Sequence, residues 1–360
     1  MTRLSAITLE GYRCFRDVTR IDLARLTVII GKNNSGKSAL CFSPAFFTRA
    51  FTDESELPFP SQWNGIDFGP LQTVITDRRA TGLGCRLDFT NSVQLAIGAT
   101  VLPERGYAQH ITAFSINDKR LTGSWEELRA ERKNFNLTFL ENFVRIVRGV
   151  RPLQPRRFPL EPRLPRTVGP LGADAAHMFR AASDLKKLEL NKWFSGIGVQ
   201  LTTKETGDDF EILVQTPTGS PVNWNDAGAG ISHILPVAAE LVLPSQQRGL
   251  LCIEQPELHL HPFAHLHIGE LFIQALETHP ELSVLVETHS DAFLMRLRKA
   301  VAAGRLSPQD ISVLYVDNSS GRTTIQSITI NKRGMLSSWP KGVFAETQAE
   351  FFALRREAQQ

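Results

Sequence analysis

The stretch Gly31-Lys-Asn-Asn-Ser-Gly-Lys-Ser38 decides the fold. It consists of a glycine, four variable residues, a second glycine, a lysine and a serine, the pattern of a phosphate-binding loop. A continuous apolar run over Leu26–Ile30 precedes it, and a helix is expected over Lys37–Ala50. In this strand–loop–helix setting, glycines let backbone N–H groups turn inward, and the helix N-terminus adds partial positive charge. The stretch therefore predicts an α/β fold that binds a nucleotide.

The side chains of this loop have separate expected roles. Lys37 would reach the β- and γ-phosphates, and the Ser38 hydroxyl would ligate Mg²⁺. The predicted cofactors are therefore ATP and Mg²⁺. An accidental glycine loop is the alternative, and it is disfavoured because the motif, the strand before it and the helix after it agree. The residues expected to surround the phosphates are Gly31, Asn33, Asn34, Ser35, Gly36, Lys37 and Ser38.

Two later strand ends carry residues that suit the same nucleotide. An apolar run ends in Glu254, whose carboxylate can hold Mg²⁺ directly or through water. Another run is followed by Glu287-Thr-His289-Ser, where the histidine can hydrogen-bond a γ-phosphate. Taken alone, Glu254 could be a solvated strand end and His289 a structural histidine. After a phosphate-binding loop, in this order, both are candidate catalytic residues, and Glu254 is also the candidate metal ligand.

A second loop of small residues precedes an apolar helix. It reads Asn225-Asp-Ala-Gly228-Ala-Gly230-Ile-Ser232. Glycines and a serine at a helix start form an anion-binding nest. One chain rarely needs two phosphate cradles for one nucleotide, whereas in a dimer this loop can close on the nucleotide held by the other subunit. An ordinary turn before a helix is the alternative.

Together these motifs resemble the ABC-type ATPase heads of SMC, RecF-like and OLD-family proteins. The resemblance rests on the two glycine loops, IEQPELHLHP at 253–262 and ETHS at 287–290, in that order. It is closest to prokaryotic stand-alone AAA-type ATPases with a short C-terminal domain of unknown function, which open with a phrase like LEGYRCFRD (9–17) and end with a Trp-Pro element like that at 339–340. The resemblance implies a P-loop NTPase with an ABC-type head, in which a mainly parallel core sheet carries an antiparallel β lobe and a helical insertion.

The resemblance also implies where particular residues act. The segment 257–262 would be the D-loop at a dimer seam, and His289 would be the switch histidine. The signature loop, which closes on the partner's nucleotide, would comprise Gly228, Gly230 and Ser232. The residues near the adenine would be Tyr12, Arg13 and Phe15.

One departure from such heads concerns hydrolysis. Gln255 follows the metal-binding acid, at the position where these heads usually carry a glutamate that activates the attacking water. An amide can position water but cannot accept its proton. Hydrolysis is therefore expected to be slow, unless Glu257 substitutes. Gln255 and Glu257 join Lys37, Glu254 and His289 as candidate catalytic residues.

Composition limits the class of protein. The chain has 360 residues, a net charge of +3 and four scattered cysteines without a C-x-x-C pair. A charge this small does not argue for nucleic acid, and the cysteine usage favours a reducing cytoplasm. Neither a signal peptide nor a membrane-spanning stretch is expected. There is no long heptad run for a coiled-coil arm, and too few residues follow residue 290 for a Toprim nuclease domain.

Residues 145–166 are rich in arginine and contain five prolines, which exclude a helix interior and favour an extended loop. This loop could grip a nucleic-acid backbone or an acidic partner. It could equally pack near the dimer groove with one arginine, such as Arg151, toward phosphate, and this reading is slightly favoured. The histidines at 259, 261, 265 and 267 invite a metal site, but no cysteine or carboxylate pattern completes one.

Hydrophobic periodicity predicts the remaining elements. Helical spacing is found in residues 124–150 and 174–194, and a hairpin is expected at 197–202 and 210–215. The final third alternates strands and helices, which predicts a mainly parallel sheet. Strands are expected at 6–10, 71–76, 85–89, 93–97 and 111–116. The predicted organisation is one head over 1–330, with an antiparallel lobe at 71–116 and an insertion at 124–194, and a short C-terminal element at 331–360.

The function predicted from these observations is that of an ATPase that forms a homodimer or a higher oligomer. It would sense or regulate for a separately encoded effector, such as a nuclease or toxin, in a prokaryotic anti-phage defence or DNA-maintenance system. A RecF-like DNA-binding repair ATPase and a non-hydrolysing ATP-dependent scaffold are the alternatives. Nucleic acid as a partner stays open, a membrane is not expected, and the predicted location is the cytoplasm.

Overall fold

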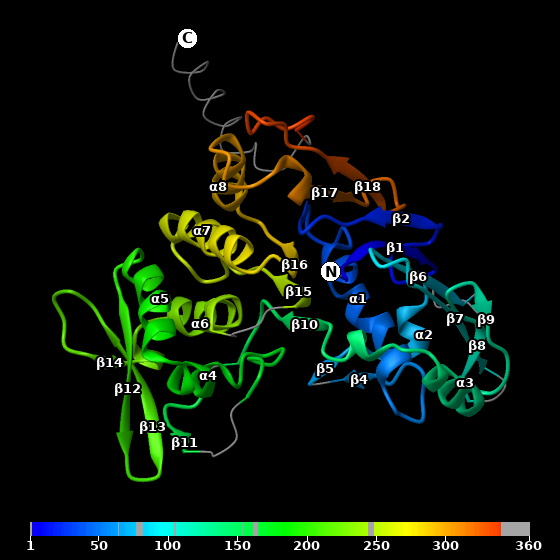
Figure 1. Ribbon diagram of the computed structural model, residues 1–360, viewed down its shortest axis with the longest axis horizontal. Coiled ribbons are helices and arrows are strands. Elements are labelled where there is room, and N and C mark those ends of the chain that lie inside the picture. Colours follow the sequence, from blue (N-terminus) through cyan, green and yellow to red (C-terminus); the bar gives the residue numbers. More distant parts are fainter. Residues whose placement is uncertain are drawn as a thin grey trace.

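The computed structural model describes residues 2–63, 65–76, 82–103, 106–152, 154–160, 165–243 and 248–339. A six-stranded core sheet runs through the middle of the molecule (Figure 1). Its first five strands are parallel and the last is antiparallel. In order, the strands are β10 (Val144–Val147), β15 (Gly249–Glu254), β16 (Leu282–Glu287), β3 (Leu26–Gly31), β17 (Ile311–Asp317) and β18 (Thr324–Ile328).

The core strands are apolar on both sides because both faces of the sheet are covered. Along β3, Val28 packs into one hydrophobic core and Ile29 into the other. Strand β15 divides in the same way, with Leu251 on the first side and Cys252 on the second. A buried parallel strand therefore shows a continuous apolar run rather than alternation.

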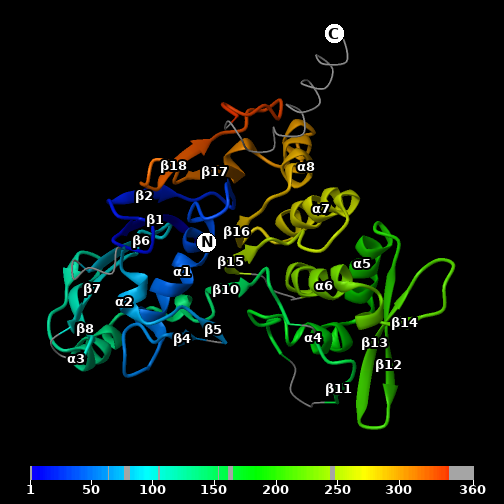
Figure 2. The same cartoon turned by 180° about the vertical axis from the view of Figure 1, so that it is seen from behind.

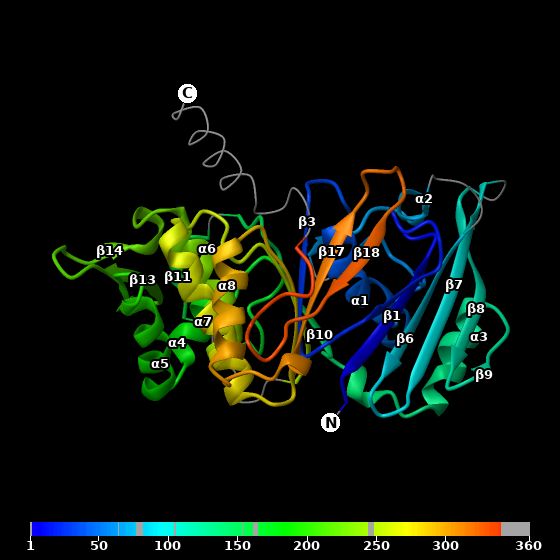
Figure 3. The ribbon, with the colours of Figure 1, turned by 90° about the horizontal axis from the view of Figure 1, so that it is seen from above.

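Helices cover one face of the core sheet, and a helix with a second sheet covers the other (Figure 3). The first face carries α6 (Ala229–Val242), α7 (Pro262–Thr278) and α8 (Asp291–Ala302). The opposite face carries α1 (Lys37–Thr52), which lies between the core sheet and an antiparallel sheet. The phosphate-binding loop thus sits between β3 and α1, at the carboxyl ends of the parallel strands.

The antiparallel sheet forms a lobe beyond α1. Its strands, in order, are β2 (Thr19–Asp22), β1 (Leu4–Glu10), β6 (Leu83–Phe89), β7 (Gln94–Leu102), β8 (Ala108–Ile116) and β9 (Lys119–Arg120). The connections around it contain β4 (Gln62–Trp63), β5 (Ile66–Asp67), α2 (Leu71–Val74) and α3 (Trp125–Glu131). Short 3₁₀ turns lie at Arg132–Asn134, Thr138–Leu140, Trp224–Asp226 and Pro308–Asp310.

A third, smaller sheet lies at the end of the molecule opposite this lobe, as Figures 1 and 2 both show. It contains β11 (Phe158–Pro159), β13 (Asp209–Gln215), β12 (Gln200–Thr206) and β14 (Val222–Asn223). Helices α4 (Ala175–Ala181) and α5 (Asp184–Ser195) pack against α6 beside it.

The predicted fold class is confirmed, as are most predicted elements of the final third and the hairpin before it. The lobe differs from its predicted limits, because β1 and β2 also belong to the antiparallel sheet. The strand predicted at 71–76 is wrong. Residues 71–74 form a helical turn in which the Pro70 carbonyl accepts hydrogen bonds from the Thr73 backbone and hydroxyl.

The helical reading of residues 124–150 is only partly confirmed. A capping box between Ser124 and Glu127 starts α3, which ends at Glu131. Beyond it, Phe139 and Phe143 reach the Phe89 ring, with centroids at 5.2 and 5.5 Å, from a chain of turns. The spacing of four residues between these aromatic side chains therefore reflects their packing on β6 and not a helix. The Arg-rich segment also starts as strand β10 instead of a loop, and residues 153, 161–164 and 340–360 of the predicted loop and C-terminal element lie outside the described residues.

Arg49 of α1 is fully buried, at 0% exposure, in a cage of phenyl rings. Its guanidinium carbon lies 4.5 Å from the centroid of Phe46, 5.0 Å from Phe68 and 5.8 Å from Phe59. None of its three side-chain nitrogens has a hydrogen-bond partner among the described residues, and burial lowers the pKa of the guanidinium to about 10. Cation–π attraction offsets only part of the desolvation of such a charge.

We expect Arg49→Met to raise the free energy of unfolding by about 2 kcal/mol, because a flexible apolar side chain of similar length removes the buried charge. Urea unfolding of the two proteins measures the difference. Arg49→Lys is the matched control. It keeps the charge but loses the planar stacking on the rings, so it should be less stable than the wild type. A methionine variant that unfolds more easily than the wild type would contradict this expectation.

Candidate nucleotide-binding site

The geometry of the loop at 31–38 requires its glycines. Gly31 has a φ of 153°, and a Cβ on it would lie 2.3 Å from the Val316 carbonyl oxygen. Gly36 has a φ of 107°, and its Cβ would lie 2.3 Å from the Cys14 Sγ. The Val316 backbone and the partly buried Cys14 side chain leave no room for a larger residue at these positions. Helix α1 begins directly afterwards at Lys37, so its N-terminus faces the loop.

A cavity of about 650 Å³ opens over this loop. Ten of the residues predicted near the nucleotide line it: Tyr12, Arg13, Asn33, Asn34, Ser35, Gly36, Lys37, Ser38, Gln255 and His289. Residues that sequence reasoning did not assign to the site also line it, among them Phe42, Asp67, Phe68, Arg148, Glu287 and Asn318. The volume suits a nucleotide, since small-molecule sites are typically about 300–1,000 Å³.

Lys37 lines the cavity and is almost completely buried. Its side chain is only 4% exposed, and its Nζ donates a 2.7 Å hydrogen bond to the Lys32 carbonyl of its own loop. Burial lowers the pKa of this ammonium group, and the nearby Glu287 carboxylate opposes that shift. Glu287 compensates the positive charge of the buried Lys37 only in part, and a bound phosphate would supply further negative charge.

Glu287 lies at the end of β16, between the strands that carry the two motifs. It pairs in register with Glu254 of β15 on one side and with Ile29 of β3 on the other. Burial raises the pKa of its carboxyl group to about 7, and the hydrogen bond from Ser38 opposes that rise. Its other carboxylate oxygen, Oε2, is buried and has no hydrogen-bond partner in the part of the chain that the structure describes. The ETHS motif was the sequence signal that could have assigned Glu287 to the site.

Glu254 is engaged with protein groups rather than facing the cavity. Its Oε2 accepts a 3.0 Å hydrogen bond from the Arg148 Nε and a 2.9 Å bond from the Gly149 backbone N–H. Glu254 is not among the residues that line the cavity, whereas Arg148 is. The Arg148 guanidinium also stacks over Phe42, 4.9 Å from the ring centroid. Arg148 belongs to the Arg-rich segment 145–166, from which one arginine was expected near phosphate, although Arg151 was the residue suggested.

Backbone hydrogen bonds also fix three residues that follow the strands of Glu254 and Glu287, namely Gln255, Glu257 and His289. The Gln255 backbone, with a φ of 42°, donates a 2.8 Å hydrogen bond to the Glu287 carbonyl. The Glu257 Oε1 accepts a 2.6 Å bond from the His289 backbone N–H. Burial raises the pKa of Glu257, and burial followed by the Lys37 charge lowers that of His289. Glu257 does not line the cavity within one copy of the chain.

One part of the cavity wall contains aromatic side chains. Tyr12, Arg13 and Phe68 line it, and the Arg13 guanidinium donates a 2.9 Å hydrogen bond to the Phe68 carbonyl. Its guanidinium carbon also lies 5.9 Å from the Tyr12 ring centroid. Phe15, the third residue predicted near the adenine, is buried in the core of the lobe and does not line the cavity.

The second glycine loop lies outside the cavity. Neither Gly228 nor Gly230 nor Ser232 lines it. Gly230 instead packs on the segment predicted as the D-loop, since a Cβ on it would lie 2.7 Å from the His259 carbonyl. The Ser232 hydroxyl donates a 2.9 Å bond to the Ala229 carbonyl. The two segments predicted to form the dimer seam are therefore adjacent, and the predicted anion nest does not face the nucleotide site of its own chain.

Two weaker sequence signals have structural explanations. Arg151, predicted to point toward phosphate, is instead buried and donates to the backbone carbonyls of Arg148 and His233. In the histidine motif, His261 caps α7, and the His265 ring contacts the Ser290 hydroxyl at 3.0 Å. Within the described ranges, no group of three His, Cys, Asp or Glu residues is arranged to hold a metal ion. No described helix combines the length and apolar character needed to cross a membrane.

The donor set of the cavity fits ATP and Mg²⁺. A buried lysine and a helix N-terminus suit phosphates, while the Ser38 hydroxyl and the unpartnered Glu287 oxygen suit a hard cation. When bound, Mg²⁺ neutralises phosphate charge. The parallel core sheet, the glycine loop and this cavity form a P-loop nucleotide-binding fold, and two parts of the sequence match AAA ATPase domain families.

Three family sequence models match parts of the chain. Residues 131–296 match "AAA domain, putative AbiEii toxin, Type IV TA system", and residues 3–50 match an AAA ATPase domain. Residues 306–354 match a family described as a protein of unknown function, DUF3696. No curated protein matches the sequence.

Solved SMC head domains are similar to the chain over most of its length. The SMC head domain from Thermotoga maritima is 12% identical, with 90% of this chain and 98% of that chain covered and a TM-score of 0.48. The SMC head domain with an extended coiled coil bound to the C-terminal domain of ScpA, from Pyrococcus furiosus, is also 12% identical. There the coverage is 99% of this chain and 100% of that chain, with a TM-score of 0.48.

Proposed function

We propose that this protein binds ATP with Mg²⁺, dimerises around the nucleotide and hydrolyses it slowly. One observation supports dimerisation most directly. The cavity of one copy contains the phosphate-binding loop, Gln255 and His289, but neither the Gly228–Ser232 loop nor Glu257. That glycine loop is exposed at Gly228 and Ala229 and lies against the D-loop segment, so a second copy can present it to the nucleotide.

Slow hydrolysis follows from the groups that face the cavity. Gln255 lines it and can orient water, but its amide cannot accept a proton. Glu257, which could substitute, is buried on the His289 backbone. The Glu257 carboxylate reaches the attacking water only if dimerisation breaks its hydrogen bond with the His289 backbone. The proposed ATPase is thus a switch whose ATP-bound dimer lasts long, and the non-hydrolysing scaffold is its limiting case.

The cellular role that we propose is to sense or regulate for a separately encoded effector, such as a nuclease or toxin, in prokaryotic anti-phage defence or DNA maintenance. The toxin–antitoxin wording of the family matched at 131–296 supports this proposal. The RecF-like alternative has weaker support. Arg156 is paired with Asp226 at 2.5 Å, while Arg157 is exposed and available to a nucleic-acid backbone. A cytoplasmic location is part of the proposal.

The dimer can be tested by molar mass in solution, using chromatography with light scattering. We expect the wild type to be a dimer in ATP and Mg²⁺ and a monomer without nucleotide. Ala229→Arg places a large cation at an exposed position of the glycine loop, so it should stay monomeric while it still binds ATP. Ala303→Arg, at an exposed alanine just after α8, is the matched control and should dimerise normally. A wild type that remains monomeric with ATP, or an Ala229→Arg dimer, contradicts the proposal.

A further inference from the structure

Two carboxylates line the nucleotide cavity among the described residues, and neither is the one that the sequence motif favours. They are Asp67 and Glu287. Asp67 lies in the lobe, is exposed, and accepts a 2.8 Å hydrogen bond from the Gly69 backbone. Glu287 lies beside the phosphate-binding loop and interacts with Ser38. Only Glu287 is therefore placed to share a cation with the Ser38 hydroxyl.

Glu254, which the sequence predicted as the metal ligand, already has partners. One of its oxygens accepts hydrogen bonds from both the Arg148 side chain and the Gly149 backbone. The arginine lines the cavity in its place. For this oxygen, Oε2, to bind a metal directly, it would have to exchange a cationic partner and a backbone donor for the ion.

Glu287 has the opposite environment. The residue is 2% exposed, and no described residue forms a hydrogen bond with its Oε2. A buried carboxylate oxygen without a partner is costly, and such groups call for a physical explanation, such as an ion. Mg²⁺ is usually held by one or two carboxylates together with a hydroxyl and phosphate oxygens, which is what Ser38, Glu287 and a nucleotide would supply.

We propose that Glu287 and Ser38 bind the Mg²⁺ of the bound nucleotide, and that the ion pair with Arg148 keeps Glu254 from binding the ion directly. This inference rests on the proposed binding of ATP with Mg²⁺, and it assigns the metal site within it. Glu287 lies between the strands of Glu254 and the phosphate-binding loop, so it can reach the ion without any rearrangement of β15.

The test compares two isosteric substitutions, Glu287→Gln and Glu254→Gln, by titration with a fluorescent ATP analogue in Mg²⁺ and in EDTA. We expect Glu287→Gln to weaken binding in Mg²⁺ by about 10- to 100-fold and to leave binding in EDTA unchanged. Glu254→Gln should cause a much smaller loss. Electron paramagnetic resonance of Mn²⁺ in the nucleotide complex gives a second readout, in which only Glu287→Gln should abolish bound Mn²⁺.

Glu287→Asp guards against misfolding of the glutamine variant. It keeps the carboxylate but shortens it, and we expect a loss in Mg²⁺ between those of the wild type and Glu287→Gln. The inference is overturned if Glu287→Gln keeps its full Mg²⁺ dependence, or if Glu254→Gln loses as much or more. A wild type that binds no nucleotide, in Mg²⁺ or in EDTA, overturns the proposed function itself and with it this assignment.

Discussion

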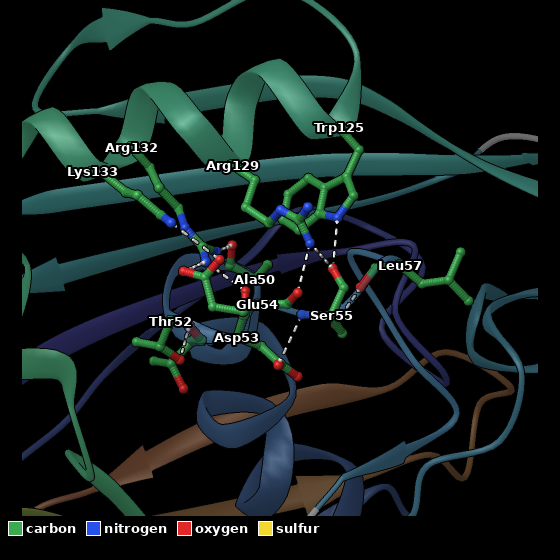
Figure 4. Close-up of polar contacts among 11 residues, drawn as sticks. Ala50, Thr52, Asp53, Glu54, Ser55, Leu57, Trp125, Arg129, Arg132 and Lys133 are labelled. Carbon is green, nitrogen blue, oxygen red and sulfur yellow. Dashed lines mark hydrogen bonds and ion pairs between the residues drawn. The ribbon is translucent and has the colours of Figure 1, made fainter.

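Arg132→Met is expected to lower the free energy of unfolding by about 3 kcal/mol. The substitution removes a buried hydrogen-bond donor, so the backbone carbonyls that accept from it are left unpaired. Arg132 follows α3 and is 4% exposed. Its guanidinium donates to the Ala50 carbonyl at 2.7 Å and to the Asp53 carbonyl at 2.5 Å (Figure 4). Both carbonyls belong to the C-terminal end of α1, where a cation also favours the helix dipole.

Arg132 and two neighbouring residues form a clamp, a set of hydrogen bonds that ties the lobe to the end of α1, the helix that follows the phosphate-binding loop. Arg129 donates to the backbone carbonyls of Glu54 and Ser55, and the Trp125 indole N–H donates to Ser55 at 3.2 Å. All three donors come from α3 or its end. Because α1 carries the loop at one end and this clamp at the other, loosening the clamp should also weaken nucleotide binding.

Lys133→Met is the matched control for Arg132→Met. Among the described residues Lys133 forms an ion pair only with Glu54, at 3.4 Å, and both side chains are more than half exposed. An exposed pair of this kind contributes at most about 1 kcal/mol. Urea unfolding of both variants measures the difference. Equal destabilisation by the two substitutions would show that Arg132 does not anchor α1.

Lys37→Ala is expected to weaken ATP binding by about 100-fold, since a charged hydrogen bond is worth about 1.5–3 kcal/mol and this lysine would reach two phosphates. Isothermal titration calorimetry with ATP and Mg²⁺ measures the loss. The fold should survive, because the ammonium group is already penalised by burial in the protein without nucleotide, and its lowered pKa reflects this. Unfolding of the variant should therefore resemble that of the wild type.

Lys32→Ala is the control for the loop. Lys32 is exposed, and only its backbone carbonyl meets the Lys37 ammonium, so the substitution should leave ATP affinity nearly unchanged. The Lys37→Ala protein also serves as the blank for phosphate release. Release by the wild type above this blank would mean that Gln255 permits hydrolysis. An ATP affinity that does not depend on Lys37 would place the nucleotide elsewhere.

The sequence alone determined the elements whose signals are local. An apolar run of strand length, two glycines at required positive φ and a helix start are all encoded within Leu26–Ala50, so their positions were predicted to within about two residues. The same holds for the strands that end in Glu254 and Glu287. Local patterns were less reliable where packing replaced them, as for Phe139 and Phe143 on the lobe.

Only the tertiary structure decided which side chains meet. Arg148 and Glu254 are 106 residues apart in sequence, and they meet because β10 and β15 are adjacent parallel strands. The insertion of β16 between β15 and β3 brings Glu287 to Ser38, on a sheet order that no motif states. Hydrogen bonds and charges act over a few ångströms of space rather than along the chain, so the partner of each acid, and with it the group left free for a metal ion, depends on how the strands are ordered.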